Sequence, residues 1–174
     1  MSVALSLVAQ AVQAKWNEQV FNQFIDHVSI DSRSLQNNAT TLFFAIKGTN
    51  HDGHQYISQL YDKGVMNFVV EKIPTNLPEN ANFLVVKNAL VALQLFATYY
   101  RNLYHFPVIG LTGSNGKTIV KEWLNFLMNK EFNIIRSPKS YNSQVGVPLS
   151  VIGINDNHTF GIFEAGISLP NEME

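Results

Sequence analysis

Apolar residues recur along the chain with two different periods, and each period predicts a different kind of element. Spacings of three and four residues from Leu5 to Trp16 predict an amphipathic helix over about residues 4–17, with Trp16 in the core. Similar spacings predict helices over residues 54–63 and 88–104. Short runs rich in β-branched and aromatic residues predict strands instead. In the first half of the chain these are residues 27–30, 41–46, 67–70 and 83–86.

The second half alternates strand and helix in the same way. The pattern predicts strands over residues 108–111, 133–136 and 159–163, and a helix over residues 117–130. Because this helix joins the first two of these strands, the three elements are expected to form a βαβ unit. The whole pattern therefore predicts an α/β fold with a mostly parallel sheet in the second half. The buried side of the helix is expected to carry Val120, Trp123, Leu124 and Leu127.

We place a domain boundary near residue 87, ahead of the long helix that begins the second half. Residues 1–87 are expected to form a small N-terminal α/β domain, and residues 88–174 the first part of a second domain. A nucleotide domain built on a parallel sheet normally has more strands than the three predicted for residues 88–174. We therefore expect the second domain to be truncated and the chain to be part of a longer protein.

Composition narrows the classes of function. The 174 residues are 46% hydrophobic, as in ordinary globular proteins, and 12 basic residues against 13 acidic ones offer no basic surplus for binding nucleic acid. The chain has no cysteine, which excludes disulfides and favours a reducing cytoplasm. No apolar run approaches the roughly 18 residues that cross a bilayer. We expect a soluble, cytoplasmic protein without membrane insertion, whose oligomeric state the sequence leaves open.

A glycine-broken turn after the strand at residues 108–111 is the main candidate site. Its sequence, Thr112-Gly-Ser-Asn-Gly-Lys-Thr118, allows positive φ angles at both glycines, so that several backbone N–H groups can point at phosphate oxygens. Lys117 adds a charge for the outer phosphates, and the Thr118 hydroxyl suits a magnesium ion. A strict P-loop would need glycine where Leu111 stands, so an ordinary helix-capping turn remains the alternative. The predicted nucleotide-binding residues are Thr112, Gly113, Ser114, Asn115, Gly116, Lys117 and Thr118.

Further motifs occur in order on both sides of this loop. They are Asp31-Ser-Arg33, Leu42-Phe-Phe-Ala-Ile-Lys-Gly48, His51-Asp-Gly-His54, Gly146-Val-Pro148 and Glu164-Ala-Gly-Ile-Ser168. Together with the loop, this set resembles the Mur ligase family over essentially the whole chain. The resemblance implies that the first domain binds a UDP-linked substrate and that the second is the front of a central P-loop ATPase domain.

The resemblance also implies a reaction. Mur ligases transfer the γ-phosphoryl group of ATP to a substrate carboxylate, and an incoming amine then attacks the acyl phosphate to form an amide. The Glu-Ala-Gly that starts at Glu164 makes the chain most similar to the branch that adds D-alanyl-D-alanine to UDP-N-acetylmuramoyl-tripeptide in peptidoglycan precursor synthesis. In some bacteria such a ligase continues into an alanine racemase. The isolated chain is expected to be inactive, because the family places a carbamylated lysine and the amine-binding domain beyond Glu174.

Particular residues acquire roles through the same resemblance. Lys117 and Glu164 are the expected catalytic residues, and Thr118 and Glu164 the expected magnesium ligands. Phosphoryl transfer depends on neutralising phosphate oxygens, which a lysine and a metal ion do well. Asn142 is an expected contact to ATP or substrate. The UDP moiety is assigned to Ser32, Arg33, Thr49 and Asn50.

Some of these assignments have local alternatives. Ser143 stands where the family usually has a second asparagine, and Ile119, expected to turn into the helix interior, replaces a family threonine. Residues 31–33 could instead be a turn with an internal Asp–Arg pair. His51 and His54 have the spacing of a metal pair, but without a third ligand a turn leading into a helix is the preferred interpretation.

Two other classes of function remain open at this stage. The loop could serve a small-molecule kinase or a GTPase, which would not need a UDP-binding domain in front. The chain could also be a module that binds nucleotide and substrate without turning them over.

Overall fold

The computed structural model describes residues 2–16, 23–33, 35, 38–49, 51–75 and 80–167. The chain forms two compact units, Met1–Phe96 and Ala97–Glu174. The break between them falls inside helix α3 (Ala89–Arg101), whereas the predicted boundary at residue 87 lies shortly before that helix. The predicted α/β class is confirmed, because both units combine helices with mostly parallel strands. Within the described ranges, none of the helices combines the length and apolar character that a bilayer crossing demands.

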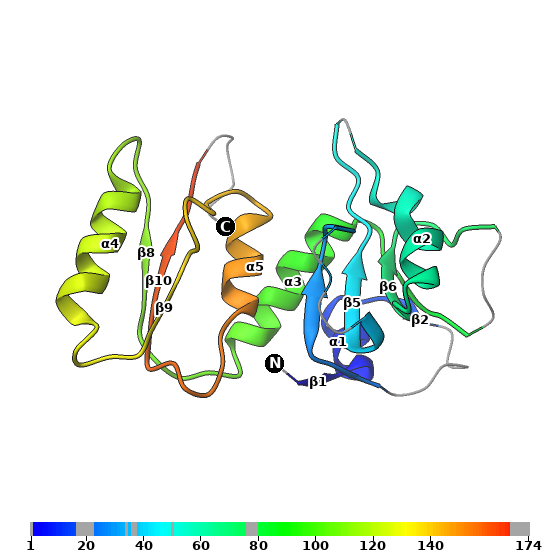
Figure 1. Ribbon diagram of the computed structural model, residues 1–174, viewed down its shortest axis with the longest axis horizontal. Coiled ribbons are helices and arrows are strands. Elements are labelled where there is room, and N and C mark those ends of the chain that lie inside the picture. Colours follow the sequence, from blue (N-terminus) through cyan, green and yellow to red (C-terminus); the bar gives the residue numbers. More distant parts are fainter. Residues whose placement is uncertain are drawn as a thin grey trace. The chain divides into compact units, whose positions relative to one another are not determined.

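The first unit is built on a five-stranded sheet with the order β2-β7-β6-β5-β4 (Figure 1). Four strands are parallel, and the short β2 joins β7 in antiparallel fashion. Neighbouring residues alternate between the two faces: Phe43 packs in a cluster with α2 (Ile57–Asp62), and Phe44 stacks on Phe96 of α3. Both faces are therefore buried, as the continuous apolar runs require. The strand bounds are Lys15–Trp16 (β2), His27–Ser29 (β4), Thr41–Phe44 (β5), Asn67–Val70 (β6) and Asn82–Val85 (β7).

The four strands predicted for this half are all present. Residues 67–70 match β6 at both ends, and the ends of the other three strands differ by at most two residues. The predicted helix at residues 54–63 begins as the 3-10 turn η2 (Gly53–Tyr56) and continues into α2. Short elements complete the unit. They are β1 (Val3–Ala4), β3 (Phe24–Ile25), which pairs with β1, and the 3-10 turn η1 (Asn38–Thr40).

Helix α1 (Leu5–Ala11) is much shorter than predicted, and the expectation that Trp16 belongs to it is wrong. The N–H of Ala14 bonds to the carbonyl of Ala9, a contact that closes the last turn of the helix. Gln13 takes the left-handed φ of 55° that glycine usually supplies at such a position. The chain therefore leaves the helix early, and Trp16 lies half-buried in β2 rather than in the core.

The second unit contains a three-stranded parallel sheet with the order β8-β10-β9, and α4 and α5 lie on opposite sides of it (Figure 1). The predicted strand–helix–strand unit is present, but β8 and β9 are not neighbours because β10 lies between them. Glu164, the last residue of β10, therefore lies opposite Leu111, the last residue before the loop. The bounds are Val108–Leu111 (β8), Lys117–Met128 (α4), Ile134–Arg136 (β9), Gly146–Ile152 (α5) and Phe160–Glu164 (β10).

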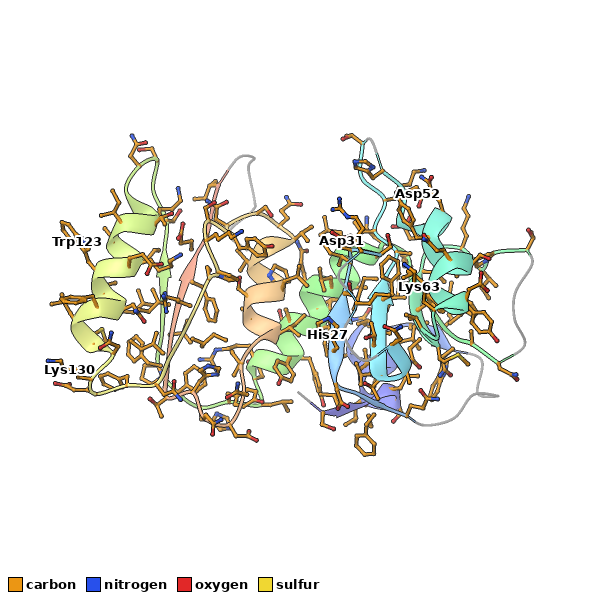
Figure 2. All side chains as sticks on the ribbon, viewed as in Figure 1. His27, Asp31, Asp52, Lys63, Trp123 and Lys130 are labelled. Atoms are coloured by element: carbon orange, nitrogen blue, oxygen red, sulfur yellow. The ribbon has the colours of Figure 1, made fainter. Side chains whose placement is uncertain are left out.

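The predicted buried face of α4 is wrong for most of its members. Trp123 and Leu127 are 69% and 72% exposed, Val120 and Ile119 are also exposed, and Leu124 is half-buried. Figure 2 shows Trp123 projecting away from the sheet. The side of the helix toward the sheet carries residues 117, 121, 124, 125 and 128. At 100° per residue its centre lies about 95° around the helix from that of the predicted stripe, with which it shares only Leu124. Ile119 therefore does not turn into the interior.

Candidate functional site

The loop between β8 and α4 has the open geometry that anion binding requires. Gly113 and Gly116 have φ angles of 131° and 79°, which side chains other than glycine rarely adopt. Among the backbone hydrogen bonds of the described residues, none uses an N–H between Gly113 and Lys117 as donor. These N–H groups stand at the start of α4, where the helix dipole also favours negative charge. Lys117 reaches back across the loop, with Nζ 2.5 Å from the carbonyl oxygen of Gly113.

Thr118 and Glu164 meet beside this loop, although they are 46 residues apart in the sequence. The Thr118 hydroxyl donates to Oε2 of Glu164 at 3.0 Å. The backbone N–H of Glu164 donates to the hydroxyl of Ser137 at 3.0 Å. A hydroxyl and a carboxylate are hard oxygen ligands, and Mg²⁺ usually takes one or two carboxylates and keeps several waters. The donor chemistry of the pair therefore suits a magnesium ion; because the Glu164 side chain is fully buried, the hydrogen bond between Thr118 and Glu164 would have to open to admit one.

Lys121 is a site residue that the sequence reasoning missed. Its side chain is completely buried, and its Nζ lies 2.9 Å from Oε1 of Glu164. The same ammonium donates to the carbonyl of Ser137 at 2.8 Å and to the carbonyl of Lys139. The available signal was its spacing, since Lys121 follows Lys117 by four residues and so lies on the same side of α4.

Asn142 lies close to the end of β10 through its backbone. Its carbonyl oxygen accepts the N–H of Gly166 at 2.7 Å, and a Cβ at Gly166 would come within 2.9 Å of the same oxygen. Ser143, which departs from the family pattern, has a local role, because its hydroxyl accepts the N–H of Gly146 at 3.1 Å at the start of α5. The structure thus brings Lys117, Thr118, Asn142 and Glu164 to one edge of the sheet.

The tripeptide at residues 31–33 forms the internal pair that was the alternative interpretation. Arg33 donates from Nε and Nη2 to the two carboxylate oxygens of Asp31 at 2.9 and 2.8 Å, and its backbone N–H donates at 2.9 Å. These hydrogen bonds lower the pKa of Asp31 to about 2. The Arg33 side chain is nevertheless 88% exposed, so it is accessible to a ligand. Ser32 is half-buried between the two.

The other predicted UDP contacts follow the next strand of the same sheet. Thr49 is exposed in the loop that Lys47 and Asp52 close through a β-bridge, and Asn50 lies outside the described residues. Ser29 in β4 pairs with Phe43 in β5, and the two strands are parallel. Because the carboxyl ends of parallel strands share an edge, Ser32, Arg33 and Thr49 all follow that edge, where α/β sheets place ligands.

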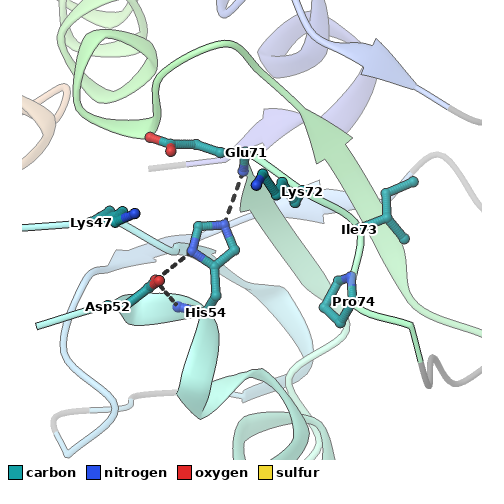
Figure 3. Close-up of a pocket in the computed structure, with 7 residues that line it drawn as sticks. All are labelled: Lys47, Asp52, His54, Glu71, Lys72, Ile73 and Pro74. Atoms are coloured by element: carbon teal, nitrogen blue, oxygen red, sulfur yellow. Dashed lines mark hydrogen bonds and ion pairs between the residues drawn. The ribbon is translucent and has the colours of Figure 1, made fainter.

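A pocket of about 230 Å³ opens at this edge between the segments that follow β5 and β6 (Figure 3). Nδ1 of His54 lies 2.6 Å from Asp52, and its Nε2 accepts the N–H of Glu71 at 3.0 Å. Both ring nitrogens are therefore occupied, which agrees with the predicted turn into a helix rather than a metal pair with His51. The described residues contain no group of three or more His, Asp or Glu side chains placed to share a metal ion. The pocket is lined by Lys47, Asp52, His54, Glu71, Lys72, Ile73 and Pro74.

Comparison with known proteins gives matches of both sequence and structure. The UDP-N-acetylmuramoyl-tripeptide–D-alanyl-D-alanine ligase of Bacillus subtilis is 30% identical over 168 residues, which cover 96% of this chain and 36% of that protein. The protein of the same name from Borreliella burgdorferi is 31% identical over 91% of this chain and 36% of its own length. A crystal structure of MurF from Acinetobacter baumannii aligns with a TM-score of 0.90 and 26% identity, over 99% of this chain and 37% of that one.

The chain thus spans a little over a third of the length of these relatives. Residues 24–101 match the catalytic domain described for the Mur ligase family, and residues 111–173 match the Mur ligase middle domain. The two matches follow one another along the chain and together cover most of it. With relatives and solved structures of the same kind, they show that this chain belongs to the Mur ligase family.

Proposed function

We propose that this chain is the front part of an ATP-dependent ligase that adds D-alanyl-D-alanine to UDP-N-acetylmuramoyl-tripeptide in cytoplasmic peptidoglycan precursor synthesis. The relatives that carry this name support the reaction. The observation that carries the proposal is the open loop at Gly113 to Lys117, placed beside Thr118 and Glu164. A function as a small-molecule kinase has no comparable support, because residues 24–101 match a domain of the Mur ligase family.

The residues of the loop would act on the phosphates of ATP. The unpaired N–H groups of residues 113–117 would donate hydrogen bonds to the phosphate oxygens, and the Lys117 ammonium would give up the carbonyl of Gly113 to bind the outer phosphates. Thr118 and Glu164 would hold Mg²⁺, which when bound neutralises charge that develops on the phosphoryl group. Asn142 lies at the same edge, where its side chain can contact ATP or substrate.

The chemistry runs through an acyl phosphate. The substrate carboxylate attacks the γ-phosphorus, the bond from that phosphorus to the bridging oxygen breaks, and ADP leaves. The amine of the dipeptide then attacks the activated carbonyl carbon, inorganic phosphate leaves, and the amine proton passes to solvent or a base. The UDP end of the substrate is assigned to the first unit, with Ser32, Arg33, Thr49 and Asn50 as contacts.

The test uses the full-length protein with Lys117→Ala and, as a matched control, Lys130→Ala, an exposed lysine just after α4. We expect Lys117→Ala to abolish amide formation and to leave binding of the UDP-linked substrate nearly unchanged by calorimetry. The control should retain both. Equal loss of ligation and substrate binding in Lys117→Ala would contradict the assignment of the two sites to separate units.

We also propose that residues 1–174 alone do not complete the reaction, since they span only a little over a third of the related ligases. Amide product formed by the purified 174-residue chain would refute this part. Failure of full-length protein to form amide from ATP, dipeptide and UDP-linked tripeptide would refute the function itself.

A further inference from the structure

Lys121 carries a charge in a place where a charge is costly. Its side chain has no exposed surface, and burying an ammonium is tolerated only when it is paired and hydrogen-bonded. Oxygens of four residues lie around Nζ: Oε1 of Glu164 at 2.9 Å, the carbonyl of Ser137 at 2.8 Å, the carbonyl of Lys139, and Oε1 of Glu122 at 3.4 Å. The two carbonyls accept hydrogen bonds from the ammonium, and the two carboxylates balance its charge.

Complete burial also limits what Lys121 can do. The oxygens nearest its Nζ all belong to the protein, so we expect any effect of Lys121 on ligand binding to pass through the groups that it contacts. Of these, Glu164 is the one next to the open loop, and its carboxylate is also fully buried. Oε2 of Glu164 accepts the Thr118 hydroxyl, whereas Oε1 faces Lys121 as an ion-pair partner and accepts no directed hydrogen bond from the described residues.

We propose that Lys121 is a positioning residue that fixes the Glu164 carboxylate, with Oε2 turned toward Thr118 and the loop. Without the ammonium, the carboxylate would lose the attraction that holds Oε1 against α4. The inference rests on the proposed function, in which Thr118 and Glu164 hold the nucleotide's magnesium ion. Residues that contact a metal-binding carboxylate and fix its orientation contribute to metal affinity, and removing such a residue typically lowers the affinity by about 10- to 100-fold.

The same contacts connect Lys121 to the segment that follows β9. Its hydrogen bonds to Ser137 and Lys139 hold the start of this segment against α4. The hydroxyl of Ser137 in turn accepts the backbone N–H of Glu164. Lys121 therefore fixes Glu164 twice, directly through the side chain and indirectly through Ser137.

The experiment measures ADP affinity of the full-length protein by calorimetry, with and without Mg²⁺. We expect Lys121→Met to lower the gain in affinity that Mg²⁺ provides by about 10- to 100-fold, and to leave the affinity without Mg²⁺ nearly unchanged. Lys130→Met, on the exposed lysine beyond α4, serves as the control and should behave as the wild type. A Lys121→Met protein with the full magnesium-dependent gain would overturn the inference and leave the proposed function standing. Absence of ADP binding in the wild type would instead count against the proposed function.

A second comparison shows whether Lys121 acts through Glu164. In a Glu164→Gln background, which already lacks the carboxylate, Lys121→Met should reduce the magnesium-dependent gain no further. Independent losses that add in the double variant would overturn the inference. If Lys121→Met alone does not fold, folding of the double variant supports the inference, because the unpaired carboxylate is then the cause. Failure of both variants to fold would overturn it, since the role of Lys121 would then lie in the backbone contacts alone.

Discussion

Gly116 holds the loop in a left-handed conformation, with φ 79° and ψ −4°, directly before α4. No atom lies within 4 Å of the position that a Cβ would occupy there, so Gly116→Ala introduces no clash with the protein. The cost is the conformation itself, about 1–2 kcal/mol for a residue with a side chain. If the loop keeps its shape, this cost appears as lost stability. If the loop relaxes, the N–H groups turn away, and nucleotide affinity falls by roughly 5- to 30-fold instead.

The assay combines urea unfolding with calorimetric titration of ADP and Mg²⁺ on the same samples. Gly64→Ala is the matched control, because Gly64 also has a positive φ of 92° but lies in the first unit, after α2. We expect Gly64→Ala to lose stability by a similar amount and to bind ADP as the wild type does. For Gly116→Ala, the loss of stability and the loss of affinity, both expressed as free energy, should together amount to about 1–2 kcal/mol.

Two results would refute this reasoning. Gly116→Ala could leave both stability and ADP affinity unchanged, which would mean that the loop has no need of the left-handed conformation. Alternatively, Gly64→Ala could weaken ADP binding as much as Gly116→Ala does, which would mean that the effect on binding is a general consequence of destabilisation.

Other outcomes can be checked on single variants. Arg33→Ala should return the pKa of Asp31 from about 2 toward 3.8 in an NMR titration. Because the pKa of Asp31 is lower in the folded state than in the unfolded state, the Asp31–Arg33 pair stabilises the protein above pH 3.8. This contribution disappears as the pH falls through 2. Phe68→Ala removes a fully buried ring from the core of the first unit and should cost about 3–5 kcal/mol in urea unfolding, whereas a loss below 1 kcal/mol would contradict the described packing. Gly166→Ala places a Cβ 2.9 Å from the carbonyl oxygen of Asn142 and should cost about 1–3 kcal/mol, with unchanged stability as the contrary result.

The strands and the loop could be predicted because their signals are local. Runs such as Asn67–Val70 are apolar enough to be buried on both faces, and their ends agree with the structure. The loop was predicted because Gly113, Gly116 and Lys117 follow a strand and precede a helix, and that order has a physical reason.

The end of α1 could not be predicted because the residue that ends it gives no signal. A left-handed residue after a helix is usually glycine, and here it is Gln13. The apolar spacing continues past this point to Trp16, so periodicity alone extends the helix too far. Tertiary pairing of β2 with β7 prevails over the helical pattern.

The orientation of α4 illustrates a different limit. Periodicity identifies an apolar stripe but not what that stripe contacts. In the structure the side of α4 that carries Lys121 packs against the sheet, and the apolar stripe that contains Trp123 is exposed. A lysine in a helix is ordinarily read as a solvated residue, so its burial depends on Glu164, a partner 43 residues further along the chain that periodicity does not reveal.

The strand order β8-β10-β9 has a consequence for how the second sheet is made during synthesis on the ribosome. Neither β8 nor β9 pairs with the other, and each depends on β10, which leaves the ribosome last of the three. A nascent chain that has exposed β8, α4 and β9 still has no strand to join them. The turn between β8 and α4 is therefore translated early but acquires its supporting strand only once residues 160–164 have emerged. Until then the two earlier strands are open to chaperones and to misassembly.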